Sequence, residues 1–447
     1  MLQSLLTGLV SLVDNFMVAG LGDVKMAAVN AANQVNFVFF IIINTACMAG
    51  GIFLSQHRGA KNPDGMRKAF RFKIIASLFI SGIYAILCAA IPEPLIGIMV
   101  SGNSSGAAII AEGSIYMRAV APSFIPFALA VALGSSFREV GKTRVSLAAS
   151  TIAALVNTFL NWIFIYGNLG APRMEVRGAA MATDIARFVE IAIFLFWLGR
   201  SRPDFHFEPR TIFDIDRKTF GTIMSRSGMM LFSETAWVVS ETIITAMYNS
   251  RGGADTVAGM AAAWTIANLF FLVFGAVHTA VAVIVGSTLG SGKLEEAKLK
   301  GRWITSGSVV FGVGIGLLAA ASNAIVPLVF GNLSFQARTT TGAMILVIAA
   351  YLPLWTLLNA QFALSRAGGD TAMGVWVDVG VTYVVFLPFA WGLSALTPVG
   401  PVALFAVAKL TDFMKAAVAA WWLKKDKWVR NLATPESRGV IGPKAGT

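Results

Sequence analysis

The chain has 447 residues, of which 56% are hydrophobic and only 13% are charged. Soluble domains carry about 25% charged residues, so this composition excludes an ordinary soluble protein. The net charge of +12 would suggest a nucleic-acid partner in a soluble protein. In a membrane protein such a charge reports the orientation of the chain instead, so we expect no nucleic-acid partner.

Uncharged stretches recur along the whole chain, for example at 74–92, 145–172 and 303–337. A helix needs about 20 residues to cross a hydrocarbon layer of about 30 Å, so each stretch can hold a membrane-spanning helix. The pattern predicts an all-α, polytopic membrane protein with twelve transmembrane helices. The expected spans are 1–21, 27–54, 74–92, 114–136, 145–166, 178–199, 220–248, 256–287, 303–326, 342–364, 372–394 and 399–423.

Lys and Arg gather in every second turn between these spans. The basic segments are 55–73, 137–144, 200–219, 288–302 and the tail after 423. Short cytoplasmic loops carry the excess of Lys and Arg in membrane proteins. We therefore expect a multi-pass protein of the inner membrane of the cell, with both termini in the cytoplasm.

The two halves of the chain resemble each other. The stretch "MAAVNAANQVNFVFF" (26–40) resembles "VAGMAAAWTIANLFF" (257–271), and "FREVGKTR" (137–144) resembles "LSRAGGDTA" (364–372). Two bundles with an even number of spans enter from the same side, so a pseudo-two-fold axis along the membrane normal should relate them, an architecture that suits alternating access. We expect an N-terminal six-helix bundle at 1–199, a cytoplasmic linker at 200–219, a C-terminal six-helix bundle at 220–423 and a cytoplasmic tail at 424–447.

The residue types that most enzymes use are scarce. The cysteines are Cys47 and Cys88, both in apolar stretches, and the histidines are His57, His206 and His278. The sequence has no CxxC metal motif and no GxxxxGK[ST] phosphate loop. We therefore expect neither an enzyme nor a bound cofactor.

Acidic residues nevertheless lie within the predicted spans, where a charge costs about 3 kcal/mol on insertion scales. Asp14, Glu234 and Asp378 have no basic residue three or four positions away, and Glu241 follows Glu234 by two helical turns on the same face. The remaining acids can form ion pairs on one helical face: Asp184 and Glu190 with Arg187, and Asp412 with Lys409 and Lys415.

These acids allow a definite chemistry. A carboxyl group in a low-dielectric cavity can hold a proton at neutral pH, because desolvation penalises its charged form. Two carboxylates and backbone carbonyls can equally surround Na⁺. A negative site can hold a coupling cation or a cationic cargo but not both at once, which couples opposed fluxes. We take Asp14, Glu234, Glu241 and Asp378 as candidate coupling residues for H⁺ or Na⁺.

Amides accompany the acids in the N-terminal half. Asn157 and Asn161 are four residues apart and share a helical face, and Asn33 lies in the second span. Hydrogen bonding between helices is the simplest role for such amides. The alternative is that Asn33, Asn157, Asn161 and Asp184 line a polar cavity in the N-terminal bundle.

Motifs along nearly the whole chain resemble the multidrug and toxic compound extrusion (MATE) family, in the order in which the family carries them. They are "VDNFMVAGLGDVKMAAVN" (13–30), "RGAKNPDGMRKA" (58–69), "FREVGKTR" (137–144), "NTFLNWIFIYGNLGAP" (157–172), "RGAAMATDIAR" (177–187), "ETAWVVSETIITAMY" (234–248), "VGSTLGSGKLEEA" (285–297) and "SRAGGDT" (365–371).

The resemblance implies a V-shaped, twelve-helix antiporter that exports amphipathic organic cations in exchange for H⁺ or Na⁺. It matches Asp14, Asn157, Asn161 and Glu234 to family positions, and Asp378 to an aspartate that some members keep after the "GGDT" turn. The stretch "WTLLNAQFALSR" (355–366) lacks an acid that many members carry. A Na⁺ site in the C-terminal bundle would therefore use Glu234 and Asp378.

One other function remains open at this stage, a flippase for a lipid-linked precursor or a polysaccharide, which shares this architecture in the wider superfamily. It predicts a cationic cavity that binds phosphates, whereas the acids at 14, 234, 241 and 378 outnumber the unpaired bases in the spans. The antiporter is therefore the preferred hypothesis, with small organic cations and the lipid bilayer as its partners and a monomer as its expected state.

Overall fold

The computed structural model describes residues 17–433, except 19, 101–105, 252 and 332. The first predicted span, 1–21, lies almost entirely outside the described residues, and Asp14 is not among them. The described parts of the chain are helical and contain no β-strand. The fold class expected from the sequence, an all-α membrane protein with twelve spans, is confirmed.

The first half of the chain forms one group of helices, several of them divided by short irregular turns. These are α2 (Asp23–Gly59), α3 (Pro63–Ala90), α4 (Pro92–Gly97), α5 (Gly106–Val120), η1 (Ala121–Ser123), α6 (Phe124–Glu139), α7 (Thr143–Tyr166), η2 (Asn168–Gly170) and α8 (Glu175–Ser201). The linker that follows contains the short helix η3 (Pro209–Thr211).

The second half forms the other group of helices. Its elements are α9 (Arg217–Asn249), α10 (Ala254–Val281), η4 (Ala282–Gly286), α11 (Ser287–Gly290), α12 (Leu294–Ala321), η5 (Ser322–Ile325), α13 (Val326–Val329), α14 (Phe335–Ala367), η6 (Gly374–Val379), η7 (Thr382–Phe386), α15 (Leu387–Leu396), α16 (Pro401–Ala408) and α17 (Thr411–Leu423). The segments η4, η6 and η7 are π-helical, with turns wider than those of an α-helix.

The long helices begin at capping residues in the polar turns. Asn62 accepts a hydrogen bond from the amide of Gly65 at the start of α3, and Asp216 accepts one from Thr219 at the start of α9. A side-chain acceptor at this position satisfies an amide that would otherwise lack a partner. The helices therefore extend several residues beyond the uncharged stretches that predicted them.

Eight of the described helical stretches are long and apolar enough to cross a membrane. The long helices α8 and α9 are not among them. Both carry acidic residues in their interiors, Asp184 and Glu190 in α8, and Glu234 and Glu241 in α9. The last predicted span, 399–423, is divided at Lys409 and Leu410 into α16 and α17. These helices outside the apolar set thus carry charged residues in their interiors, and Asp378 is a charged residue inside one of the eight apolar stretches, Gly374–Leu396.

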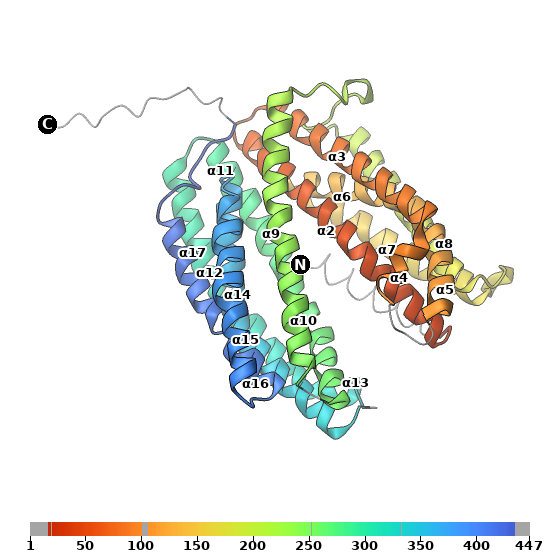
Figure 1. The fold of residues 1–447 in the computed structure, drawn as a ribbon. Helices are drawn as coiled ribbons and strands as arrows, with labels where there is room; N and C mark the ends of the chain where they lie inside the picture. Colours follow the sequence, from red (N-terminus) through yellow and green to blue (C-terminus); the bar gives the residue numbers. More distant parts are fainter. Residues whose placement is uncertain (1–16, 19, 101–105, 252, 332, 434–447) are drawn as a thin grey trace.

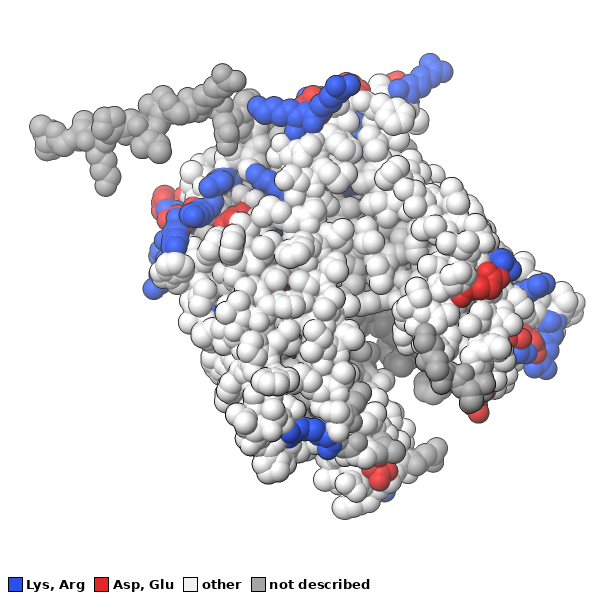
Figure 2. Space-filling model, viewed as in Figure 1, with Lys and Arg blue, Asp and Glu red and all other residues white. Residues whose placement is uncertain are grey.

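The two groups of helices form the arms of a V. Figure 1 shows α2–α8, in red to yellow, on one side and α10–α17, in green to blue, on the other, with α9 between them. The arms meet at the top of the view, where the linker and the end of α17 lie, and separate toward the bottom. Figure 2 shows Lys, Arg, Asp and Glu gathered near the ends of the molecule, with a nearly uncharged band between them, as expected of a surface that faces lipid.

Each arm has its own apolar core. In the N-terminal bundle, Phe39 stacks on Tyr84 with ring centroids 4.5 Å apart, and Phe124 meets Phe39 edge-on at 5.1 Å. In the C-terminal bundle, Phe405 lies against Tyr248 at 5.5 Å and belongs to a separate cluster of buried residues. Such pairs add about 0.5–1.5 kcal/mol beyond the area they bury, so each bundle is stabilised by a core of its own.

The bundles touch backbone to backbone at the linker end, through α2 and α11. A Cβ atom at Gly290 would lie 1.8 Å from the carbonyl oxygen of Gln56, and one at Gly59 would lie 1.8 Å from the carbonyl oxygen of Ser287. Only glycine permits so close an approach. We call this contact, made by Gln56, Gly59, Ser287 and Gly290, the closed interface.

The side chain of Gln56 extends the closed interface to two further segments. Its Nε2 donates to the carbonyl of Ala367 at the end of α14 across 2.8 Å. Its Oε1 accepts from the amide of Leu432, in the tail, across 2.6 Å. Gln56 is fully buried, so one amide joins the N-terminal bundle to the C-terminal bundle and to the tail.

Candidate functional site

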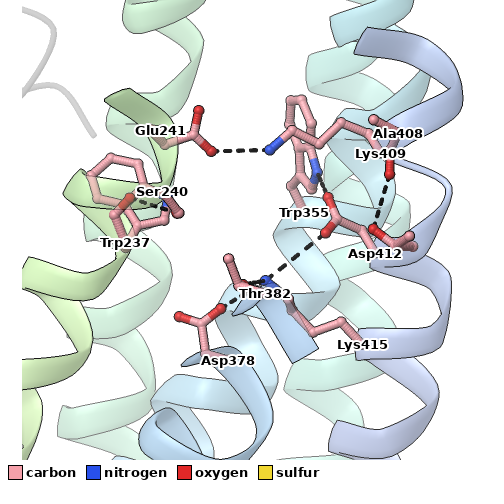
Figure 3. A network of polar contacts seen from close by, with 11 residues as sticks. Trp237, Ser240, Glu241, Trp355, Asp378, Thr382, Ala408, Lys409, Asp412 and Lys415 are labelled. Atoms are coloured by element: carbon pink, nitrogen blue, oxygen red, sulfur yellow. Dashed lines mark hydrogen bonds and ion pairs between the residues drawn. The ribbon is translucent and has the colours of Figure 1, made fainter. Parts of the chain in front are cut away.

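Charged residues inside the C-terminal bundle form a connected cluster. Figure 3 shows Glu241 of α9, Asp378 and Thr382 of the π-helical turns, Lys409 of the α16–α17 break, and Asp412 and Lys415 of α17 directed toward one another. We call the five charged residues the C-terminal cluster: Glu241, Asp378, Lys409, Asp412 and Lys415.

Lys415 is shared by two acids. Its Nζ lies 2.8 Å from Oδ1 of Asp378 and 4.0 Å from Oδ1 of Asp412, and it donates to Oγ1 of Thr382 across 2.9 Å. The indole of Trp355 donates to Oδ2 of Asp412 across 2.9 Å. The lysine side chain is only 12% exposed, so water screens these interactions weakly.

Glu241 and Lys409 form the second pair in the cluster. Nζ of Lys409 lies 3.0 Å from Oε1 of Glu241 and 4.7 Å from the ring centroid of Phe386. The ion pair between Asp412 and Lys415 that the sequence predicted is present. The sequence also predicted an ion pair between Lys409 and Asp412, which are three residues apart. That pairing is not seen among the described contacts, because the backbone turns at Lys409 and Leu410 between α16 and α17 and Lys409 reaches α9 instead.

The cluster has more acids than bases. Three carboxylates, at Glu241, Asp378 and Asp412, face two ammonium groups, at Lys409 and Lys415. With all five groups charged, one negative charge is left without a counter-charge in the interior of the bundle. A bound proton or small cation would neutralise that charge.

The local backbone explains why this cluster forms here. Asp378 lies in the π-helical turn η6, and Thr382 begins η7. An extra residue in a π turn changes the direction of the side chains that follow, and such turns are frequent at functional sites. The sequence offered no periodic signal for these turns, and an ordinary α-helix was expected over 372–394.

Glu234, the other candidate acid of α9, lies outside this cluster. Its Oε1 accepts from Nη2 of Arg366 across 2.9 Å, and the two side chains are 31% and 13% exposed. Nη1 of the same guanidinium contacts Sδ of Met48, in α2, at 3.6 Å. Arg366 belongs to the last turn of α14 and reaches both α9 and the N-terminal bundle.

No described contact joins Glu234 to Asp378, the two residues expected to hold Na⁺, because each pairs with its own base. Among the described residues, no group of three or more His, Cys, Asp or Glu side chains could hold a metal ion.

The N-terminal bundle encloses a cavity of about 560 Å³. Asn33, Asn157 and Asn161 line it, the alternative that the sequence left open beside hydrogen bonding between helices. The last two amides are also linked to each other, with Nδ2 of Asn161 3.4 Å from Oδ1 of Asn157. The aromatic residues in the lining are Phe40, Tyr116, Phe124, Phe127 and Phe194.

Charged residues also line this cavity: Arg138, Arg187 and Glu190. Nη1 of Arg187 donates to Oε2 of Glu190 across 2.7 Å, which confirms the ion pair expected from their spacing. Oε1 of Glu190 accepts from Oγ of Ser150 across 2.9 Å. Asp184 is absent from the lining, and among the described residues no ion pair joins it to Arg187.

The sequence indicated the acids of the C-terminal bundle but missed their partners. Glu234, Glu241 and Asp378 each pair with a base from a different helix, namely Arg366, Lys409 and Lys415. Spacing along one helix cannot reveal such pairs. The available signal was that Lys409 and Lys415 lie within the last predicted span, where a base also needs a partner.

Comparison with known proteins agrees with this architecture. The MatE family model matches residues 1–163 and 230–392. The chain is 26% identical over 418 residues to the multidrug resistance protein PmpM of Pseudomonas aeruginosa, covering 90% of this chain and 81% of that protein. It is 22% identical over 427 residues to the probable multidrug resistance protein NorM of Halalkalibacterium halodurans, covering 92% and 89%.

Solved structures share the fold. A transporter of the MOP superfamily from Pyrococcus furiosus superposes with a TM-score of 0.83 at 18% identity, over 95% of this chain and 93% of that chain. The family model covers well over half of the sequence, in two segments, one in each half of the chain. The chain therefore belongs to the MatE family of multi-pass membrane transporters, as its motifs predicted.

Proposed function

We propose that this chain is a secondary active antiporter that exports amphipathic, mainly cationic organic compounds in exchange for H⁺ or Na⁺. Relatives that match most of its length are named multidrug resistance proteins. The observation that carries the proposal is the C-terminal cluster, in which three carboxylates face two ammonium groups. That cluster supplies a site for one cation without any bound cofactor.

In the proposed cycle, the coupling ion acts by shifting the ammonium group of Lys415 from one carboxylate to another. In the structure its ammonium group is nearer to Asp378 than to Asp412, at 2.8 Å against 4.0 Å. A proton or Na⁺ that binds at Asp378 releases the ammonium group toward Asp412. The π-helical turn that carries Asp378 then loses its ion pair to α17, which lets the two segments move apart.

Glu234 connects the C-terminal bundle to the N-terminal bundle through Arg366. Arg366, its partner, also contacts Met48 of the N-terminal bundle. Neutralising Glu234 frees the guanidinium and weakens a contact between the bundles. We keep Asp14 as a further coupling residue in the N-terminal bundle. It lies outside the described residues, so its role is a proposal from the sequence alone.

On the basis of the Lys and Arg distribution, we place the linker and the tail on the cytoplasmic side of the inner membrane. The arms of the V then separate toward the outside, which corresponds to an outward-facing state of a monomeric transporter. Closing that side and opening the closed interface would complete alternating access.

Reconstituted vesicles test the proposal. Uptake of a fluorescent organic cation is measured under an imposed H⁺ gradient, an imposed Na⁺ gradient or neither, for the wild type and for Glu241→Gln, Asp378→Asn and Glu234→Gln. We expect one gradient to drive uptake and the variants to lose the coupling while they still bind the dye. Gradient-driven uptake that is unchanged in all three variants contradicts the assigned roles.

One observation favours the second candidate, a flippase for an anionic lipid-linked precursor. The described lining of the N-terminal cavity has two guanidinium groups, Arg138 and Arg187, against the single carboxylate of Glu190. Phosphate groups are bound by such cationic linings. Transport of a fluorescent lipid-linked phosphate without any imposed ion gradient would support this candidate and contradict the antiporter.

A further inference from the structure

Among the described residues, one basic group that lines the N-terminal cavity takes part in no ion pair. Arg138, in the last turn of α6, lines the cavity and is partly buried. Its guanidinium forms no hydrogen bond and no ion pair with any residue that the structure describes, although the carboxylates of Glu139 and Glu190 attract it from beyond ion-pair distance. A charged group in a low-dielectric interior is normally paired directly, so the N–H groups of Arg138 are available to a ligand.

Neighbouring basic residues of the same bundle do have partners. Lys73 is fully buried and donates to Oε2 of Glu139 across 2.7 Å and to Oγ of Ser136 across 3.1 Å. Arg58 donates to the carbonyl oxygen of Glu139 across 2.9 Å. The fold therefore satisfies its structural bases nearby, and Arg138 differs from them in pointing its charge at an open cavity.

The acid that also lines the cavity is already engaged on both oxygens. Oε1 of Glu190 accepts from Ser150 and Oε2 accepts from Arg187. The pair Arg187–Glu190 is neutral, so the described lining keeps one net positive charge, at Arg138. The complementary ligand group is an oxyanion, which a guanidinium binds through two parallel N–H···O bonds.

We propose that Arg138 forms an oxyanion subsite for the cargo, so that the preferred cargo is an amphiphile with both a cationic group and a carboxylate. This inference rests on the proposed function and defines its substrate class more narrowly. The cavity of about 560 Å³ has the size of a site for a small organic molecule. Phe40, Phe124 and Phe127 supply apolar walls beside the guanidinium, and Asn157 and Asn161 supply amides.

A matched pair of dyes tests the subsite. Rhodamine B carries a xanthylium cation and a free carboxylate, and its ethyl ester carries the cation alone. Binding of each dye to the purified protein in lipid nanodiscs is measured by fluorescence anisotropy. The proteins are the wild type, Arg138→Gln, Arg138→Lys and the control Arg118→Gln, an exposed arginine of the same bundle that pairs with Glu93.

We expect the wild type to bind the free acid more tightly than the ester. Arg138→Gln should weaken binding of the acid roughly 10- to 100-fold, the range of a charge-assisted hydrogen bond, and leave the ester unaffected. Arg138→Lys should retain part of the preference, and Arg118→Gln all of it. Binding of the ester shows that each variant is folded. A loss that is equal for both dyes, or no loss at all, overturns the proposal.

A third arm distinguishes cargo from lipid as the source of the oxyanion. Short-chain phosphatidic acid is added as a competitor of the ester dye. If it displaces that dye only when Arg138 is present, while the free acid has no advantage over the ester, the subsite binds lipid phosphate and our proposal is wrong. Gradient-driven uptake of the ester tests the antiporter separately, because the ester has no group for Arg138.

Discussion

Nη2 of Arg366 lies 2.9 Å from Oε1 of Glu234, although the two residues are 132 positions apart in the chain. The contact joins the last turn of α14 to the middle of α9, and the same arginine reaches Met48 of the other bundle. Glu234 has no basic residue three or four positions away on its own helix. Its partner is instead a base from another helix, near the contact between the bundles.

A double-mutant cycle should show that this pair is coupled. Arg366→Gln leaves Glu234 with its charge and no partner, which we expect to destabilise the protein by about 2 kcal/mol, less than the roughly 3–5 kcal/mol of a fully buried pair. The double variant Glu234→Gln/Arg366→Gln should be more stable than Arg366→Gln alone. Thermal unfolding of the purified proteins measures both. Additive effects of the two substitutions would show that the pair is not coupled.

Lys415→Gln should strengthen binding of the coupling cation. The substitution removes the ammonium group that competes for Asp378 and Asp412, so the two carboxylates bind a proton or Na⁺ roughly tenfold more tightly. Release then becomes slow, and turnover falls. The concentration of cation that gives half-maximal uptake reports the affinity, and the maximal rate reports turnover.

The matched control for that experiment is Lys425→Gln, an exposed lysine beyond α17 that stacks on Trp421. It should leave both quantities at their wild-type values. An unchanged half-maximal concentration in Lys415→Gln would show that this lysine does not compete with the ion.

The start of α9 should respond to pH. A hydrogen bond from the amide of Thr219, aided by Lys68, lowers the pKa of the Asp216 carboxyl from 3.8 to about 2. Because the pKa is lower in the folded state, this stabilisation is complete above about pH 4 and is lost as the pH falls toward 2. Asp216→Ala should cost about 1 kcal/mol at pH 7 and progressively less below pH 4.

Thermal unfolding of wild type and Asp216→Ala at pH 7, 4 and 3 measures this difference. Asp204→Ala, which changes an exposed aspartate of the same linker, should show no such pH dependence. A cost that stays constant down to pH 3 would rule out the carboxylate as its source.

The closed interface should open when the Gln56 side chain is removed. Gln56→Leu abolishes the bonds to Ala367 and Leu432, and we expect the inward-facing state to gain population. A cysteine at Ser55, which is fully buried beside η4, should then react faster with a water-soluble maleimide. Cys47 and Cys88 are replaced by serine in all of these proteins.

The chain offers a matched control in Gln361, a buried glutamine that donates to the carbonyl of Ala416 within the C-terminal bundle. Gln361→Leu should leave the labelling rate of the Ser55 cysteine unchanged. Equal acceleration by both glutamine substitutions would mean that general loosening, and not the closed interface, exposes the cysteine.

The fold was largely predictable, because uncharged stretches and the alternation of basic turns are dictated by the bilayer. The second to twelfth spans coincide with helices, and the long uncharged stretches at 145–172 and 303–337 overlap α7 and α12. The sequence predicted that Asn157 and Asn161 share a helical face, and both line the N-terminal cavity, but it favoured hydrogen bonding between helices as their role.

The partners of the acids were not predictable. Asp378 meets Lys415 through a π-helical turn, and Glu241 meets Lys409 because a helix breaks at that lysine. Both departures from regular helix depend on tertiary packing, for which a single sequence has no periodic signal. Arg138 looked like one more positive charge of a cytoplasmic turn, and only the cavity shows that it faces inward.

The glycines of the closed interface have an energetic consequence. Gly59 and Gly290 press against carbonyl groups of the opposite bundle, so the backbones touch there with no side chain from either glycine between them. Separating such surfaces exposes little hydrocarbon to water and leaves no cavity behind. In the cycle that we propose, the two end states can therefore lie close in free energy, so that the small driving force of one coupling ion would be enough to move the protein between them.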